Sequence, residues 1–230
     1  KNYYPFNSRI ELTGKVGNEP VIIRSWERDG ARQFNLKSNH AGRVLKGFDI
    51  VDSISGGWLN IDGEITGTGE TEVTKTDISI TKFGLKDAPL FTQVLNAASL
   101  VGLLDTLRGK GIQFQKLNAE VIFTENKIEI TDSFAFGASL GLSTTGEIAR
   151  DTDETSVKGM IVPAYALNRL IDQIPILGRI LTGGEKEGLL AAEYLISGTR
   201  DRPTVTVNPL TALTPGFLRA FVKATRKPIE

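Results

Sequence analysis

The sequence predicts a mainly β protein with helices, in the α+β class, in which an elongated antiparallel sheet is flanked by two to four α-helices. Three observations predict this class. Apolar and polar residues alternate with a period of two in several stretches, turn-forming residues separate these stretches, and glycine accounts for 24 of the 230 residues. Helices do not alternate regularly with the strands, so an antiparallel meander is expected rather than a parallel sheet.

The predicted strands follow one another along the chain. In the stretch GGWLNIDGEITGTG, Leu59, Ile61 and Ile65 share one face and alternate with polar residues. Two alternating runs between residues 117 and 136 flank Asn126, a turn former, and this arrangement predicts a β-hairpin. The predicted strand segments are residues 9–16, 56–69, 76–84, 117–136, 135–146 and 202–209.

Apolar residues at helical spacing predict helical insertions at about 39–55, 88–108, 164–182 and 215–225. Asn39 is the expected N-cap of the first helix. In the second, Asp87 suits the N-cap and Pro89 suits the first turn, whereas Pro175 must kink or break the third. No Ser/Gly linker divides the chain, so residues 1–225 are expected to form a single domain, followed by a disordered tail at 226–230.

Composition argues against several classes of function. The 27 basic and 27 acidic residues balance, so the positive surface of a nucleic-acid-binding protein is not expected. The chain has no cysteine and one histidine, which argues against thiolate chemistry, multi-histidine metal sites and a histidine-based catalytic triad. That histidine, His40, is expected beside a helix start as a capping or surface residue. We therefore expect no metal, no cofactor and no nucleic-acid partner.

Carboxylates are the remaining candidates for acid and base chemistry. Asp62, Glu64, Glu120 and Glu129 all fall at polar positions of alternating strands, where a solvated outer face is the simpler interpretation. The acidic segment 151–154 lacks the glycine turn and distal glutamate of a calcium loop and is expected to be an exposed hairpin loop. We find no catalytic constellation and predict that the protein is not an enzyme.

The apolar face of the predicted sheet is the remaining candidate site. One interpretation is a closed core, either a sandwich or a sheet covered by its own helices. The other is an open, curved sheet that shelters acyl chains, which requires a continuous face without charge and no catalytic residue. The candidate residues of this face are Leu59, Ile61, Ile65, Ile78, Ile80, Phe114, Val121, Phe123, Ile128, Ile130, Phe134, Phe136, Leu140 and Leu142.

Several long phrases of the sequence carry a resemblance to a known family. They are NHAGRVLKGFDIVDSISGGWLNIDG, DAPLFTQVLNAASLVGLLDTLRGKGIQF, GMIVPAYALNRLIDQIPILGRILTGGEKEGLLAAEYLISGTRDRP and VTVNPLTALTPGFLRAFV. In this order they resemble the C-terminal region of the AsmA-like proteins, in the YhdP-like branch of Gram-negative bacteria. The resemblance runs from about residue 38 to residue 222.

The resemblance implies a bridge-like lipid transfer protein. Such proteins are periplasmic and anchored to the inner membrane by an N-terminal helix, which this sequence lacks, and they carry phospholipids to the outer membrane. The sheet would then form a groove with an apolar concave face that the helices plug or flank, or the helices would touch a membrane surface. The helix residues given this role are Phe91, Leu95, Val101, Leu104, Leu170, Ile174, Ile176 and Leu177.

The leading prediction is thus a non-enzymatic domain that shelters phospholipid acyl chains during outer-membrane biogenesis. The alternative is a docking module for outer-membrane or other envelope proteins that binds no lipid and pairs through a sheet edge or a C-terminal helix. An enzyme acting on lipid or glycan is disfavoured by the single histidine, the lack of cysteine and the lack of a constellation.

Overall fold

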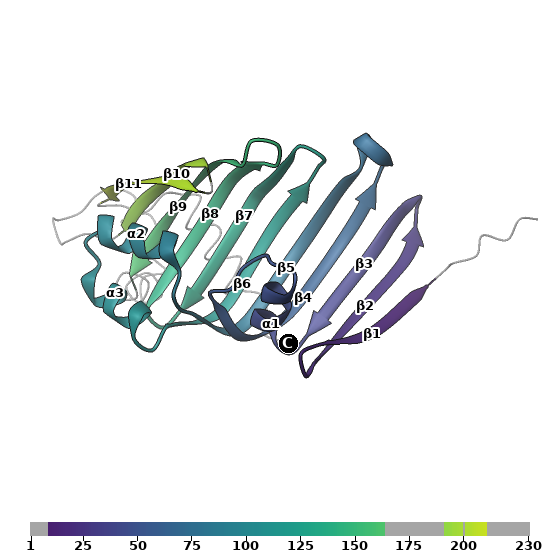
Figure 1. The fold of residues 1–230 in the computed structure, drawn as a ribbon, viewed down its shortest axis with the longest axis horizontal. Helices are drawn as coiled ribbons and strands as arrows, with labels where there is room; N and C mark the ends of the chain where they lie inside the picture. The colour runs from purple at the N-terminus through teal and green to yellow at the C-terminus, as the bar shows by residue number, and fades with distance from the viewer. Residues whose placement is uncertain (1–8, 164–190, 200, 211–230) are drawn as a thin grey trace, which may run out of the picture.

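The structure, a computed structural model, describes residues 9–163, 191–199 and 201–210. These residues form one open antiparallel sheet of 11 strands with three α-helices (Figure 1). Every strand pairs with its neighbours in sequence, so the sheet is a simple meander, as predicted. The strands are β1 Ile10–Val16, β2 Glu19–Arg28, β3 Ala31–Ser38, β4 Ile54–Thr66, β5 Val73–Leu85, β6 Ile112–Phe123, β7 Lys127–Gly137, β8 Leu140–Ala149, β9 Glu154–Pro163, β10 Ala191–Thr199 and β11 Arg202–Leu210.

Tight turns set the register of the hairpins. Asp29 and Gly30 join β2 to β3 with φ values of 53° and 79°, the combination that a two-residue hairpin turn requires. The hairpin predicted around Asn126 is confirmed, because β6 and β7 flank it and the Thr124 N–H donates to the Lys127 carbonyl at 2.9 Å. A single 3-10 turn, η1 Gly69–Thr71, lies between β4 and β5.

The three helices are shorter than the sequence predicts. They are α1 Ala41–Gly47, α2 Pro89–Ala97 and α3 Val101–Arg108, so the predicted helix 39–55 ends early and the predicted helix 88–108 is broken. The C-terminal ends of α1 and α2 are each followed by a non-glycine residue in the left-handed conformation, Asp49 (φ 56°) and Ser99 (φ 56°) respectively. The sequence signal for a helix end is a glycine, which neither position has.

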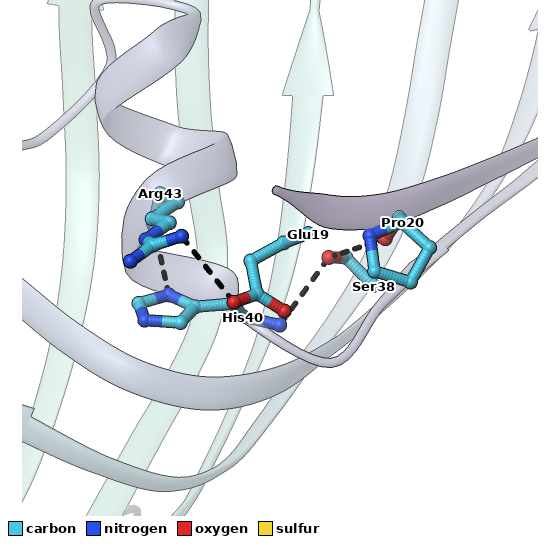
Figure 2. A network of polar contacts seen from close by, with 5 residues as sticks. All are labelled: Glu19, Pro20, Ser38, His40 and Arg43. Atoms are coloured by element: carbon cyan, nitrogen blue, oxygen red, sulfur yellow. Dashed lines mark hydrogen bonds and ion pairs between the residues drawn. The ribbon is translucent and has the colours of Figure 1, made fainter. Parts of the chain in front are cut away.

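The start of α1 is tied to the sheet by polar contacts (Figure 2). His40 is its N-cap, in place of the predicted Asn39, and its Nδ1 accepts from the Arg43 N–H at 3.2 Å. Ser38 Oγ donates to the Pro20 carbonyl at 3.0 Å and accepts from the His40 N–H, while Arg43 pairs with Glu19 at 3.3 Å. The prediction that His40 is a capping residue is confirmed. It differs from a usual cap because an imidazole nitrogen replaces the hydroxyl or carboxylate oxygen.

Cross-strand pairing divides the sheet into two faces. Side chains of directly paired residues lie on the same face, so the pairs Leu59–Ile80, Ile80–Leu117 and Leu117–Ala135 define one face across β4 to β7. We call this the apolar face. The helices pack on it, since residues of α1, α2 and α3 share one buried cluster with strand residues from β2 to β10. The stacked rings of Phe83 and Phe114, 5.1 Å apart, belong to the same cluster.

The predicted helices 164–182 and 215–225, with Leu170, Ile174, Ile176 and Leu177, and the predicted tail 226–230 lie outside the described residues.

Candidate functional site

An apolar row crosses six strands at the centre of the apolar face. Its members are paired directly from strand to strand, each is half-buried or exposed, and the four central ones pack against the buried cluster. We call this set the open row. It consists of Leu12, Ile23, Leu36, Ile61, Ile78 and Ala119. Leu12, at the edge of the sheet, is 60% exposed, so apolar side chains here are left accessible by the described part of the protein.

The neighbouring positions toward the helices are covered. Leu59 and Ile80 are 3% exposed, and Leu140 on β8 is fully buried. The predicted plug residues Leu95 and Leu104 are buried in this core, and Phe91 packs against it half-buried. Val101 begins α3. The described helices therefore cover one end of the apolar face and leave the open row beside them. One part of the face thus matches a sheet covered by its own helices, and the other part matches an open sheet.

Twelve of the fourteen predicted face residues lie on the apolar face by register. Two do not. Phe134 pairs with Asn118 and Phe136 pairs with Lys116, both on the opposite face, so the assignment of these phenylalanines to the apolar face is wrong. Their ring centroids lie 6.2 Å apart on that face, and Met160 and Val162 of β9 occupy the same two cross-strand rows, one strand beyond β8.

A β-bulge in β7 causes this error. The pairing of β7 with both neighbours shifts between Ile130 and Phe134, so one extra residue stands in that strand. An extra residue inverts the alternation for every position that follows. Ala135 therefore takes the apolar-face position that strict alternation gives to its neighbours, and it is buried at 3% exposure.

Charge is kept to the margins of the apolar face. In the described strands, the acidic and basic residues that register places on it are Glu19, Glu27 and Arg32, all at strand ends, and Glu19 is paired with Arg43. Polar groups farther in are satisfied, since Thr76 donates to the Val121 carbonyl at 3.0 Å. An acyl chain lying along the open row would thus meet no buried ion.

Tyr194 is a buried ionisable side chain on the apolar face. Its hydroxyl donates to the Ser143 carbonyl at 2.9 Å and shares a hydrogen bond of 2.7 Å with Thr144. Burial raises the pKa of Tyr194 to about 12, because the phenolate would be desolvated, and the Thr144 contact opposes this only in part. Among the described residues, the hydroxyl contacts a hydroxyl and a carbonyl group and no basic side chain, so Tyr194 is a buried structural phenol.

The candidate carboxylates lie on the opposite, polar face. Asp62 accepts hydrogen bonds from Asn35 at 2.8 Å and Asn60 at 2.6 Å, and Glu64 accepts one from Gln33 at 2.7 Å. Glu129 is paired with Lys127, whose pKa is raised by Glu129 and Glu147, and register puts Glu120 opposite Asp77. Among the described residues, no group of three metal-ligating side chains converges, and the segment 151–154 is an exposed turn that leads into β9.

Four members of the open row are absent from the predicted face residues, namely Leu12, Ile23, Leu36 and Ala119. Leu12 and Ala119 lie in predicted strand segments, whereas the other two do not. Ile23 and Leu36 lie on β2 and β3, which are absent from the predicted strand segments. In β2 the run Val21-Ile22-Ile23 hides the alternation, because Ile22 is apolar but lies on the polar face. The Asp29-Gly30 pair is the signal that locates this hairpin in the sequence.

In comparisons with known proteins, no family model, no curated protein and no solved structure matches the chain. Among the described residues, no helix is long and apolar enough to span a membrane.

Proposed function

We propose that this chain is a non-enzymatic lipid-handling domain that shelters phospholipid acyl chains along the open row of its apolar face. The observation that carries the proposal is the row itself, which is continuous over six strands, accessible and free of charge. Each methylene group buried from water against such a surface contributes about 0.8 kcal/mol, so the binding free energy increases with the length of acyl chain that the row shelters.

The cellular setting of this proposal comes from the AsmA-like, YhdP-like resemblance. In that setting the domain belongs to a periplasmic protein that is anchored to the inner membrane by a helix outside this sequence. It receives phospholipid for transport to the outer membrane, and it needs no cofactor. The charge-free open row beside the helices is the structural feature that supports this assignment.

A docking module is the second candidate, and the edge of the sheet favours it. Strand β1 is the terminal strand of the described sheet, and its Ile10 and Leu12 side chains are 55% and 60% exposed. A terminal strand presents backbone groups that a partner strand from an envelope protein can pair with. This candidate predicts no phospholipid in the purified chain.

The proposal is tested by loading the chain with fluorescent phosphatidylethanolamine from vesicles and by extracting bound lipid for mass spectrometry. Leu12→Asp places a charge at the accessible end of the open row, and we expect it to lower lipid loading by roughly tenfold. Thr13→Asp is the matched control, because it adds the same charge to the opposite face of the same exposed strand.

Equal loading of the wild type and both variants would show that the open row is not the lipid site. A chain that neither carries phospholipid after purification nor takes it up from vesicles would contradict the lipid proposal and leave the docking module. Circular dichroism of both variants checks that the sheet is intact.

A further inference from the structure

The open row has a defined length within the described sheet. It extends from Leu12 on β1, the terminal strand of that sheet, to Ala119 on β6, and these strands lie side by side in Figure 1. Neighbouring strands of a sheet are about 4.8 Å apart, so the five spacings between β1 and β6 give a row of roughly 24 Å. The row therefore crosses the strands instead of following one of them.

Polar groups close the row beyond β6. Ser133 on β7 is paired with Ala119, so it takes the next position of the row, and it is half-buried. On β8 and β10 the same level is taken by Thr144 and Tyr194, whose hydroxyls share a hydrogen bond of 2.7 Å, and Tyr194 is 4% exposed. An acyl chain that continued past β6 would first remove the Ser133 hydroxyl from water and would then have to displace a buried ring.

The open row is also bounded along both sides. On the side toward the helices, its neighbours Leu59 and Ile80 are 3% exposed and belong to the buried cluster. On the other side Phe34 is paired with Gly63, and its ring occupies the space that a Cβ atom of Gly63 would take. Thr76, the next residue on that side, is 8% exposed. The accessible strip is therefore one residue wide, which is enough for one extended chain.

The length of this strip corresponds to a long acyl chain. An extended chain of single bonds advances roughly 1.2 Å per bond, so a row of roughly 24 Å matches about 18–20 carbon atoms, and each strand corresponds to about four of them. All six members of the row have aliphatic side chains, so each methylene group that lies on the row is removed from water without covering a polar side chain of it.

We propose that the open row shelters a single acyl chain of limited length, about 18–20 carbons, which lies across the strands with its methyl end at β6. This inference rests on the proposed function, because it takes the open row as the lipid site. The headgroup lies beyond the edge of β1, where Leu12 is 60% exposed, and stays in water. The row therefore selects the length of the acyl chain and not the chemistry of the headgroup.

The test measures affinity as a function of chain length. Saturated fatty acids, each kept below the concentration at which it aggregates, displace dansylundecanoic acid from the purified chain. We expect the affinity to rise by roughly twofold or more for each added carbon up to about 18–20 carbons, and to change little beyond that length. Lysophosphatidylcholines of the same chain lengths are expected to show the same limit, because their headgroup stays outside the row.

Two variants should move this limit in opposite directions. Ala119→Asp places a charge at the inner end of the row, and we expect it to lower the limit by about four carbons, the equivalent of one strand. Ser133→Val extends the apolar row to β7, and we expect it to raise the limit by about four carbons. Asn118→Asp is the matched control, because it adds a charge to the opposite face of β6 beside Ala119 and should leave the limit unchanged.

The outcomes separate this inference from the proposed function. An affinity that keeps rising across the series, or a limit that neither variant moves, would overturn the inference and leave the lipid site in place. Different limits for fatty acids and lysophosphatidylcholines would show that the headgroup enters the row. No binding of the dansyl fatty acid, together with no uptake of phosphatidylethanolamine from vesicles, would contradict the proposed function itself. Should Ala119→Asp fail to fold, the limits of the wild type and of Ser133→Val decide the question.

Discussion

At the scale of single residues, the core of this protein depends on satisfied polar groups as well as on apolar contact. Tyr194 belongs to the same buried cluster as Leu140 and Ile161, yet its hydroxyl has two partners on β8. Gly159 lies beneath the ring, where a Cβ atom would come within 2.5 Å of the Tyr194 hydroxyl. Ionising the phenol or moving it from this position would therefore lower the stability of the folded state.

Tyr194 makes stability sensitive to alkaline pH. Its pKa in the folded protein is about 12, whereas an unfolded tyrosine titrates near 10. Between these values the unfolded chain loses a proton that the folded chain retains, so stability falls as the pH rises. Between pH 10 and 12 we expect the free energy of unfolding of the wild type to fall by about 2–3 kcal/mol more than that of Tyr194→Phe.

Urea unfolding of both proteins at several pH values measures this difference. The comparison cancels the titration of lysines and of the other tyrosines, which the two proteins share. At neutral pH, Tyr194→Phe is expected to cost about 1 kcal/mol for the lost hydrogen bonds. Parallel pH profiles for the two proteins would show that Tyr194 is not protected from ionisation.

At the scale of elements, short backbone motifs end the helices and change the face on which strand side chains lie. After α2, the Leu100 N–H donates to the Leu95 carbonyl and the Ser99 N–H to the Asn96 carbonyl, which is a Schellman motif. Leu95 and Leu100 both contact the buried cluster, so the motif fixes the angle at which α3 follows α2. The bulge in β7 has the comparable effect in a strand, because it turns Phe134 and Phe136 to the polar face.

The left-handed Ser99 predicts a stabilising substitution. A side chain at φ 56° is strained, whereas glycine adopts this conformation freely, so we expect Ser99→Gly to raise the free energy of unfolding by about 0.5–1 kcal/mol, measured by urea unfolding. Ser99→Ala is the control, since it removes the hydroxyl but retains the Cβ atom, and it is expected to give little change. An equal gain in both variants would attribute the effect to the hydroxyl and not to the backbone.

At the scale of the whole molecule, one buried cluster joins most of the sheet. It extends from Val21 on β2 to Tyr194 on β10 and includes residues of every described helix. A long open sheet would otherwise behave as a series of nearly independent hairpins. The shared cluster predicts that distant strands unfold together.

Leu140→Ala tests this coupling. Leu140 on β8 is fully buried, so its truncation is expected to cost about 2–5 kcal/mol. Both tryptophans lie far along the chain, on β2 and β4, and their fluorescence reports on the N-terminal strands alone. If the sheet unfolds as one unit, the midpoint seen by tryptophan fluorescence falls by as much as the midpoint seen by circular dichroism. A fluorescence midpoint unaffected by Leu140→Ala would mean that the two ends unfold separately.

Much of the architecture could be predicted because it depends on local pattern. Alternation located β1, β4, β5, β6, β7, β8 and β11, and the lack of regular crossover helices indicated a meander. The helix lengths and the face of Phe134 and Phe136 could not be predicted, because a left-handed Ser99 and a bulge leave no mark in the local sequence pattern. Leu140 is buried and Ile61 is half-buried, although both occur in the same kind of alternating sequence. Alternation alone therefore could not predict the difference in their burial.

Local sequence was enough to predict an antiparallel sheet with one apolar and one polar face, because alternation is a property of neighbouring residues. The folded structure was needed to show which part of the apolar face the helices cover and that the open row remains accessible beside them. These relations join residues that are distant in sequence, and they depend on strand register and helix packing, which no local pattern encodes.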